Sequence, residues 1–474
     1  MTGFSHRVFA PGGNKLATGV PKTQRKSKER TVSTSNSMSD VTLAYEGKRS
    51  IQDILEIEPA ATRILWTGTS EQNANILYYG DNKRILASLL QKPEIRGQVR
   101  LIYIDPPFAT NSVFQSRSQG DAYCDLLVGA HYIEFLRERL ILLRELLSDD
   151  GSIYVHLDEN MAFHIKIIMD EIFGRKNFRN WITRKKCNPK NYTHRTYGNI
   201  SDYILFYTKS EDYVWNRPFL PWTDKDAAKE YQYVEKETGR RYKKVPVHAP
   251  GVRNGATGQG WRGRLPPPGK HWQYPPEVLD EMDARGEIYW SPSGNPRRKV
   301  YLETSEGIPV QDIWMEFKDA HNQNINITGY PTEKNPGLLS RIIEASSNPD
   351  DLVLDCFAGS GTTLAVASQL KRRWIGIDNS GEAISTILRR FAKGLEPMGD
   401  FVSKEALPSS KIEFKYASDL WKNTEQKKEQ EPHLLKKHRI IRDFVLASDE
   451  NFINDLNQAL LQWLEWINEN TQCT

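Results

Sequence analysis

The stretch Asp351-Leu-Val-Leu-Asp-Cys-Phe-Ala-Gly-Ser-Gly-Thr-Thr363 predicts a buried strand that ends at Asp355, a turn of small residues, and then a helix. Glycines in the turn let backbone approach a ligand closely, and the first turn of the helix presents unpaired N–H groups to an anion. Residues 373–378 predict a second strand, which ends at Asp378, 23 residues after Asp355. A carboxylate at that place can accept both hydroxyls of a ribose, so the pattern indicates a nucleotide-like cofactor.

The predicted cofactor contacts in this stretch are Asp355, Phe357, Ala358, Gly359, Ser360, Gly361, Thr362, Thr363 and Asp378. A Gly-x-Gly element alone is weak evidence, because it also fits an ordinary strand–helix turn or an NAD site that lacks its third glycine. The full pattern Asp-x-Phe-Ala-Gly-Ser-Gly-Thr is far more specific.

A second motif, Asp105-Pro-Pro-Phe108, begins 250 residues before the end of the predicted cofactor strand and follows a predicted buried strand, 99–104. Open parallel sheets place their sites at the carboxyl ends of strands. The Asp105 carboxylate and the Pro106 carbonyl can accept hydrogen bonds from an amino group, while Pro106 and Pro107 stiffen the loop and remove two N–H donors. Phe108 offers a flat apolar face to a ring. Asp-Pro and Pro-Pro are also routine turn residues, so the motif gains its weight from the strand before it and from the glycine-rich stretch.

Together the two motifs resemble the amino-directed DNA methyltransferases that use S-adenosyl-L-methionine. The order, with Asp-Pro-Pro-Phe first and the glycine-rich loop last, resembles the permuted β class of N6-adenine and N4-cytosine enzymes. The resemblance implies an α/β fold with a doubly wound, mostly parallel Rossmann-like sheet. It also implies methyl transfer to an exocyclic amino nitrogen of a base rotated out of duplex DNA, as in restriction-modification systems. Asp105, Pro106, Pro107 and Phe108 would then be the catalytic residues. Cys356 stands where this family commonly has Pro.

The same resemblance assigns further cofactor contacts outside the glycine-rich stretch. In the segment Gly329-Tyr-Pro-Thr-Glu-Lys-Asn-Pro336, Pro331, Thr332 and Lys334 would line the methionine end of the cofactor. Asp81 would approach its adenine. For Lys334 an ordinary surface lysine is the alternative, and Asp81 could equally be the N-cap of the following helix.

The first residue of the catalytic motif favours adenine N6 as the target. An acidic residue there resembles the adenine-N6 members, whereas Ser is usual in cytosine-N4 enzymes. Phe108 in place of the commoner Tyr leaves cytosine N4 open. An RNA or protein-amide methyltransferase is a second alternative, because related Asn-Pro-Pro loops serve those substrates, and a nucleic-acid-binding protein without activity is a third. No cysteine follows a proline, which argues against cytosine C5 chemistry. His156 would flank the pocket or be a structural histidine.

Strands alternate with helices along two parts of the chain, as expected for a sheet covered on both faces. The predicted divisions are a disordered basic tail (1–49), a catalytic half (50–215), a target-recognition insertion (216–311), a cofactor half (312–400), and a polar linker with a helical extension (401–474). The motifs cover roughly 70–215 and 312–395. The insertion is assigned only by its position and composition.

The insertion region is loop-rich, aromatic and basic. Residues 181–300 contain six of the twelve tryptophans, with 22 Lys/Arg against 13 Asp/Glu, a balance of +9 in a chain of net charge +4. A solvated charged face would explain these counts about as well as a surface for DNA phosphates. The predicted DNA contacts are Arg240, Arg241, Lys243, Lys244, Arg262, Arg264, Arg297 and Arg298.

Composition limits the remaining classes. The chain has no apolar run of membrane-spanning length and no secretory leader, so we expect a prokaryotic cytoplasmic protein with no membrane partner. Its four scattered cysteines indicate a reducing compartment and no metal site. Double-stranded DNA is the expected partner. A homodimer and a separately encoded restriction endonuclease stay open.

Overall fold

The computed structural model describes residues 41–68, 75–107, 113–115, 121–124, 129–189, 195–319, 326–328, 330, 333–397, 440–455 and 458–469. Most of the predicted tail, Phe108, Pro331, Thr332 and the predicted linker lie outside the described residues. Among the residues that are described, no helix is long and apolar enough to cross a membrane.

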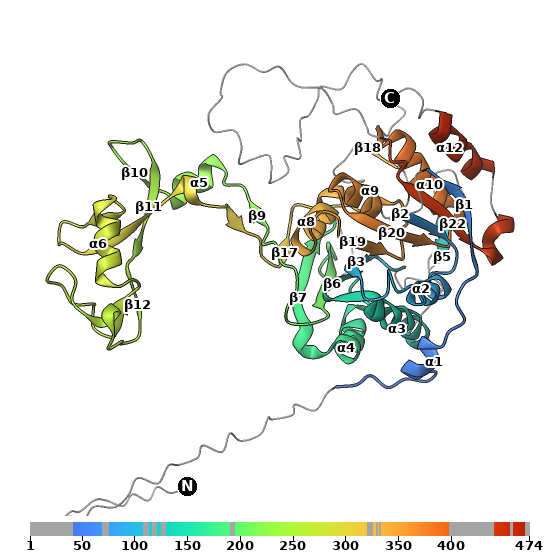
Figure 1. Ribbon diagram of the computed structural model, residues 1–474, viewed down its shortest axis with the longest axis horizontal. Helices are drawn as coiled ribbons and strands as arrows, with labels where there is room; N and C mark the ends of the chain where they lie inside the picture. The colour runs from blue at the N-terminus through green and yellow to red at the C-terminus, as the bar shows by residue number, and fades with distance from the viewer. Residues whose placement is uncertain are drawn as a thin grey trace, which may run out of the picture. The chain divides into compact units, whose positions relative to one another are not determined.

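A ten-stranded sheet forms the centre of the fold (Figure 1). Its strands, in spatial order, are β1 (Thr62–Thr67), β22 (Phe444–Asp449), β2 (Asn75–Tyr79), β20 (Arg373–Asp378), β19 (Leu352–Asp355), β3 (Val99–Ile104), β6 (Leu147–Leu157), β8 (Ser201–Thr208), β7 (Phe178–Lys185) and β17 (Ile313–Trp314). The run from β22 to β6 is parallel throughout. Strands β1, β8 and β7 introduce antiparallel pairs nearer the two edges. The sheet is therefore mostly parallel at its centre, as predicted.

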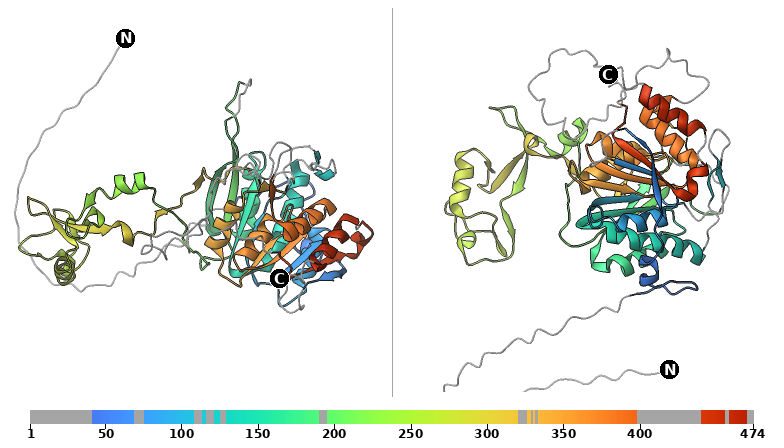
Figure 2. Two further views of the ribbon diagram at one scale, coloured as in Figure 1. Left: turned by 90° about the horizontal axis from the view of Figure 1, so that it is seen from above. Right: turned by 45° about the vertical axis from the view of Figure 1, so that its right-hand side comes forward.

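Helices cover both faces of this sheet (Figures 1 and 2). Helices α2 (Asn82–Leu90), α3 (Gly129–Leu146) and α4 (Ala162–Phe173) share one apolar core, and α8 (Pro336–Ser346), α9 (Thr362–Gln369), α10 (Gly381–Lys393) and α12 (Gln458–Glu469) share the other. Strand β3 contributes Ile102 and Ile104 to the first core and Leu101 and Tyr103 to the second. Successive side chains of a strand point to opposite faces, so a strand covered on both sides needs a continuous apolar run.

The two predicted motifs meet where the chain changes direction across the sheet. Strand β19 lies between β20 and β3, and the register pairs Leu354 with Ile102. From β19 the chain continues through α9 to β20 on one side, while from β3 it continues through α3 to β6 on the other. Crossovers that leave in opposite directions open a crevice at the carboxyl ends of the two strands. Asp105 and Asp355 lie at this crevice.

The C-terminal segment contributes a strand that the sequence analysis did not anticipate. Strand β22 lies between β1 and β2, and all six of its residues are buried. Helix α12, which lies in the predicted helical extension, adds Leu460, Leu464 and Ile467 to the core beside α10. The sequence analysis assigned 401–474 to a linker and a helical extension, and β22 corrects that assignment. A short apolar run that is buried on both faces shows no alternation, so periodicity alone does not separate a strand from a helix there.

The insertion builds a smaller sheet with a core of its own. Strands β10 (Tyr233–Val234), β11 (Arg241–Pro246), β15 (Pro296–Tyr301) and β14 (Ile288–Trp290) form an antiparallel sheet in that order. Helix α6 (Pro276–Ala284) packs with it around Val247, Trp261 and Trp272. The tryptophans here therefore serve the packing of the module, at least in part.

The remaining elements are short. They are α1 (Ile51–Leu55), β4 (Val113–Gln115), β5 (Asp121–Cys124), η1 (Arg175–Asn177), β9 (Phe219–Leu220), α5 (Asp224–Glu230), β12 (His248–Pro250), η2 (Ala256–Gly258), β13 (Lys270–Trp272), η3 (Leu302–Thr304), β16 (Ile308–Pro309), β18 (Asn326–Ile327), β21 (Glu396–Pro397) and η4 (Glu450–Asp455).

Candidate active site

Asp105 follows β3 directly and marks the catalytic end of the crevice. The Lys334 ammonium lies 2.5 Å from Asp105 Oδ2, and both side chains are largely buried. Asp105 Oδ1 is also buried, and it has no hydrogen-bond partner within the described structure. Pro106 and Pro107 line the same pocket. The motif thus presents a carboxylate whose second oxygen still lacks the donor that a buried acceptor requires.

A buried histidine stands behind this carboxylate. His156 Nδ1 is 2.8 Å from the Tyr103 hydroxyl and 3.9 Å from Asp105 Oδ1. Its Nε2 lies 3.0 Å from Asp202 Oδ2, and Asp202 in turn pairs with Arg184. Burial alone would raise the pKa of Asp202, but His156 and Arg184 hold it well below its usual range. His156 is thus held within the fold, close to Asp105 and outside the pocket lining.

The glycine-rich loop adopts the backbone that its sequence predicts. Gly359 and Gly361 have φ values of 49° and 73°, a left-handed conformation that other residues seldom adopt. A Cβ on Gly361 would lie 2.8 Å from Ile387 Cγ1, so helix α10 packs too closely for a side chain there. Asp355 accepts hydrogen bonds from Phe357 N–H (3.0 Å) and Thr363 Oγ1 (2.6 Å).

Two carboxylates face this loop, of which Asp355 is buried and Asp378 is half-buried. Burial raises the pKa of Asp355 to about 7, although the Thr363 hydroxyl and the Phe357 N–H oppose the shift. Burial also raises the pKa of Asp378, which accepts hydrogen bonds from Gly359 N–H (2.8 Å) and Ser380 N–H (2.9 Å). Carboxylates kept in so dry a place are typical of binding sites.

The end of the pocket away from Lys334 is lined by aromatic rings with polar groups at their edges. Asn82 Nδ2 donates to the Cys356 carbonyl (2.8 Å), and Arg139 Nε donates to Asn82 Oδ1 (2.6 Å). The Arg139 guanidinium lies 3.7 Å from the ring centroid of Phe135, whose own centroid is 6.1 Å from that of Phe357. Aromatic faces with amide and guanidinium groups at their edge suit a purine ring.

A buried ion pair joins the cofactor loop to the segment before α8. Arg390 pairs with Glu333 and donates to the Ser360 carbonyl (3.0 Å) and to Thr362 Oγ1 (2.6 Å). Glu333 also accepts hydrogen bonds from the backbone and hydroxyl of Thr328. Because this network is buried and well hydrogen-bonded, it fixes the backbone next to Lys334 relative to the glycine-rich loop.

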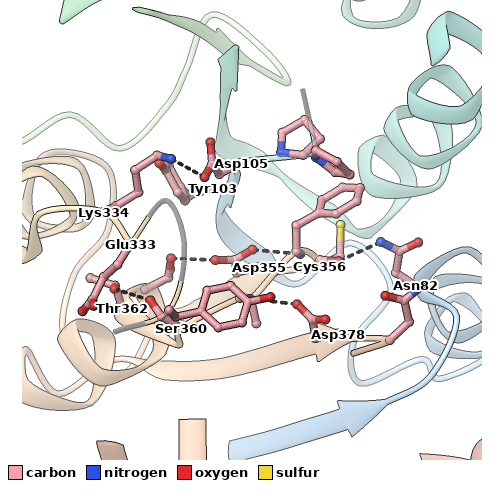
Figure 3. Close-up of a pocket in the computed structure, with 18 of the residues that line it drawn as sticks. Asn82, Tyr103, Asp105, Glu333, Lys334, Asp355, Cys356, Ser360, Thr362 and Asp378 are labelled. Atoms are coloured by element: carbon pink, nitrogen blue, oxygen red, sulfur yellow. Dashed lines mark hydrogen bonds and ion pairs between the residues drawn. The ribbon is translucent and has the colours of Figure 1, made fainter. Parts of the chain in front are cut away.

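Most of the predicted catalytic and cofactor residues line one pocket (Figure 3). These are Asp105, Pro106, Pro107, Lys334, Asp355, Phe357, Ala358, Gly359, Ser360, Thr362, Thr363 and Asp378. Gly361 shapes the turn without lining the pocket. Asp81 caps α2 by accepting the Lys83 N–H and lies outside the lining, while its neighbour Asn82 lies within it. Phe108 and Thr332 lie outside the described residues.

The sequence analysis missed several lining residues. They are Asn82, Tyr103, Phe135, Arg139, Tyr330, Glu333, Cys356 and Asn379. Some stand beside a predicted residue, so adjacency could have found them. Phe135 and Arg139 occupy one face of a long amphipathic helix, where nothing in the sequence separates a pocket residue from a core residue. The described residues contain no cluster of His, Cys, Asp or Glu able to hold a metal ion.

The predicted DNA contacts are distributed over the insertion, and many have acidic partners. Arg240 pairs with Glu303, Lys243 with Glu230 (2.7 Å), and Arg262 with Asp280 (2.9 Å). Arg298 donates to the Tyr274 hydroxyl (2.6 Å) and Arg264 to the Ser293 carbonyl (3.2 Å). Lys244 lies 3.6 Å and 3.5 Å from the ring centroids of Tyr233 and Tyr289. Arg241 and Arg297 are exposed on the sheet.

A doubly wound sheet with an Asp-Pro-Pro loop and a glycine-rich loop at one crevice defines a class of protein. The pocket fits S-adenosylmethionine, since it offers a ribose-type carboxylate, an aromatic slot and a helix N-terminus within one cavity. The class is that of the methyltransferases that use this cofactor to modify exocyclic amino groups in DNA. The ten-stranded sheet confirms the predicted fold class, and the family of the chain confirms the predicted enzyme class and cofactor.

The N6_N4_Mtase model, described as DNA methylase, matches residues 99–389, and the chain belongs to this family. It is 50% identical over 367 residues to the Type II methyltransferase M.EcaI of Enterobacter cloacae, covering 77% of this chain and 80% of that protein. Its identity to the DNA adenine methyltransferase YhdJ of Escherichia coli (strain K12) is 27% over 319 residues, which cover 67% and 82% of the two chains.

A further relative is a longer protein. The chain is 27% identical over 333 residues to the Type III restriction-modification enzyme StyLTI Mod subunit of Salmonella typhimurium. The match covers 62% of this chain and 50% of the subunit, so the chain spans about half the length of that relative.

Proposed function

We propose that this protein methylates adenine N6 at a specific site in duplex DNA. The observation that carries the choice of base is Asp105, an acidic residue at the first position of the catalytic loop, whose Oδ1 lacks a hydrogen-bond donor. The likeness to a DNA adenine methyltransferase supports the same base. Cytosine N4 is the alternative, because its exocyclic amino group offers the same two hydrogens.

The residues of the pocket would perform the chemistry by positioning and charge. An amino nitrogen conjugated to a ring is a poor nucleophile, because its lone pair is delocalised. Asp105 and the Pro106 carbonyl would accept hydrogen bonds from its two hydrogens and favour a more tetrahedral nitrogen. S-adenosylmethionine would supply the methyl group and leave as S-adenosylhomocysteine, and the amino nitrogen would lose one proton, which the Asp105 carboxylate is placed to accept. Asp378 and the aromatic slot around Phe357 would hold the cofactor in place, so that orientation contributes much of the rate. Phe108 as the stacking partner of the base stays a prediction.

The strand register divides the predicted DNA contacts between two faces of the insertion sheet. Lys244 pairs with Lys299 across β11 and β15, and Arg297 pairs with Pro246 and Tyr289, so these residues share one face. Lys243 and Arg298 lie on the other face, where Ile288 and the tryptophan core pack. We propose that the face with Lys244 and Arg297 contacts DNA phosphates, because it combines these cations with the exposed ring of Tyr233 and the half-buried ring of Tyr289.

The enzyme is further proposed to act within a prokaryotic restriction-modification system, because one of its relatives is the Mod subunit of a Type III restriction-modification enzyme. Methylation would then protect DNA from a separately encoded endonuclease that cleaves the same site. DNA methylated by this protein and challenged with the candidate endonuclease would remain intact. The oligomeric state stays open, and sedimentation velocity would determine it.

The deciding experiment is mass spectrometry of nucleosides from DNA incubated with the protein and isotope-labelled S-adenosylmethionine. DNA of many sequences from an unmethylated host is the substrate, and Asp105→Ala is the matched control. Labelled N6-methyladenine is the expected product, and sequencing then locates the site. Labelled N4-methylcytosine would support the chemistry proposed for the pocket but overturn the choice of adenine as the target base. Label in no nucleoside would overturn the proposed function and direct the search to RNA and protein substrates.

A further inference from the structure

One ion pair spans the pocket from the cofactor half to the catalytic half. Lys334 belongs to the segment that precedes α8, whereas Asp105 follows β3, and their charged atoms lie 2.5 Å apart (Figure 3). Lys334 is 7% exposed. Its neighbour Glu333 is fixed by Arg390 and Thr328, so the backbone from which Lys334 extends is held in place. The flexible part is the lysine side chain itself.

This ion pair conflicts with the role proposed for Asp105. An amino group of a base must donate to the Asp105 carboxylate, whose Oδ1 still lacks a donor, but Lys334 already pairs with Oδ2 and offsets the negative charge that makes the carboxylate a strong acceptor. The acceptor is therefore capped in the structure without ligands.

The cofactor carries a carboxylate that can compete for the same lysine. Lys334 lines the pocket together with the glycine-rich loop, and the ribose-type carboxylate Asp378 lies at the other end (Figure 3). A ligand with its ribose at Asp378 extends its amino-acid part toward Lys334 and Asp105. The long, flexible stem of a lysine can carry its charge from one anion to the other.

We propose that Lys334 is a positioning residue that caps Asp105 until the cofactor binds and then pairs with the cofactor carboxylate. The inference rests on the proposed function and adds to it an order of binding. Cofactor binding frees Asp105 for the base, so cofactor and base bind with positive coupling. By linkage, a change that removes the Asp105 carboxylate and leaves Lys334 in place must tighten cofactor binding.

The test is a double-mutant cycle on cofactor affinity, with no DNA present. The probe is S-adenosylhomocysteine, because its uncharged sulfur lacks the sulfonium charge that Asp105 would attract, and binding is measured by calorimetry. Asp105→Asn should tighten binding by about 3- to 30-fold, because Lys334 no longer has to leave a carboxylate. In a Lys334→Met background the same substitution should change affinity less than about twofold.

Two outcomes would overturn the proposal. Unchanged or weaker binding by Asp105→Asn would mean that Lys334 does not leave Asp105 when the cofactor binds. Equal tightening with and without Lys334 would mean that Asp105 simply repels the ligand carboxylate. The control is Asp170→Asn on α4, which breaks another lysine–carboxylate pair (Lys166, 2.7 Å) away from the pocket lining and should leave affinity unchanged.

A second measurement keeps the inference testable if one variant does not fold. The affinity for an unmethylated duplex that carries the target sequence is measured with and without S-adenosylhomocysteine. In the wild type the ligand should tighten DNA binding, and Lys334→Met should abolish that difference. If S-adenosylhomocysteine tightened DNA binding by Lys334→Met as much as by the wild type, the inference would be overturned. The proposed function would still stand if the wild type produced labelled methylated nucleosides.

Discussion

Asp105 shows how much a single residue depends on its surroundings in this protein. Its carboxylate faces Lys334 on one side and lies 3.9 Å from His156 on the other. The sequence predicts the residue and its role, but neither neighbour follows from the motif. What the pocket supplies is a buried acceptor with one oxygen unsatisfied, a state that binding of a donor can relieve.

Replacement of Asp105 by alanine should abolish methyl transfer while leaving cofactor binding measurable. Loss of the acceptor leaves the amino nitrogen delocalised and poorly nucleophilic, and removal of such a charged acceptor is expected to cost about 10²- to 10⁴-fold in rate. Single-turnover transfer of labelled methyl and calorimetric binding of S-adenosylhomocysteine measure the two properties. Retained transfer would remove Asp105 from its proposed role.

The raised pKa of Asp355 predicts a pH dependence of cofactor binding. Burial holds this carboxyl near pKa 7 in the free protein, so it is largely protonated at pH 6 and ionised at pH 8. The cofactor brings cationic groups, which favour the ionised form. Affinity should therefore rise with pH through about 7, by up to about tenfold per unit below that value.

The measurement for Asp355 is calorimetry at pH 6, 7 and 8 in buffers of different ionisation enthalpy. Binding at pH 6 should release a proton to the buffer. Asp355→Asn cannot ionise, so it should bind the cofactor with a weaker pH dependence and no such release. A flat profile in the wild type would contradict the assignment.

At the scale of elements, the glycine-rich turn joins β19 to α9 and shapes the pocket wall. Gly359 should tolerate a side chain as far as the fold is concerned, because a Cβ there would lie 3.5 Å from Tyr330, its nearest contact. Its φ of 49° adds a strain of about 1–2 kcal/mol. A leucine at this position would extend into the pocket and should weaken cofactor binding at least tenfold.

Gly97 offers the matched control for that substitution. It also has a positive φ, 69°, and a Cβ there would meet nothing within 4 Å. Gly97→Leu should lower the free energy of unfolding by a similar amount and leave cofactor affinity unchanged. Equal affinities of the two variants would refute the place of Gly359 in the cofactor site.

Strand β22 makes the C-terminal segment part of the main sheet. Leu446 is fully buried between β1 and β2, so Leu446→Ala should lower the free energy of unfolding by about 2–5 kcal/mol in a denaturant titration. Leu461 on α12 is 49% exposed, and its replacement by alanine should have a much smaller effect. A small loss in Leu446→Ala would mean that β22 contributes little to the stability of the sheet.

At the scale of the whole molecule, the two faces of the insertion sheet should differ in their effect on DNA binding. The double variant Lys244→Gln with Arg297→Gln should weaken affinity for duplex DNA and reduce the slope of log affinity against log salt by about 2, because two phosphate contacts are lost. Arg241→Gln with Lys243→Gln removes the same charge from the opposite face. Equal losses of DNA affinity in both variants would contradict the proposal that only the face with Lys244 and Arg297 contacts DNA.

Much of the candidate site was predictable because its residues belong to two short motifs. Each motif ends a buried strand, and strand, turn and helix follow from local patterns of apolar and small residues. The residues that the sequence did not predict, such as Asn82 and Arg139, come from helices whose register against the sheet is a matter of packing. Their residue types are ordinary for a helix, so the sequence carries no signal of their role.

The sequence by itself determined the alternation of strands and helices, the two loops and the chemistry that they can perform, because these depend on neighbours along the chain. The tertiary structure alone decided that β22 completes the sheet, that Lys334 caps Asp105, and that the cations of the insertion divide between two faces. Those features join residues far apart in the chain. They depend on register and on burial from both sides, which no local pattern encodes.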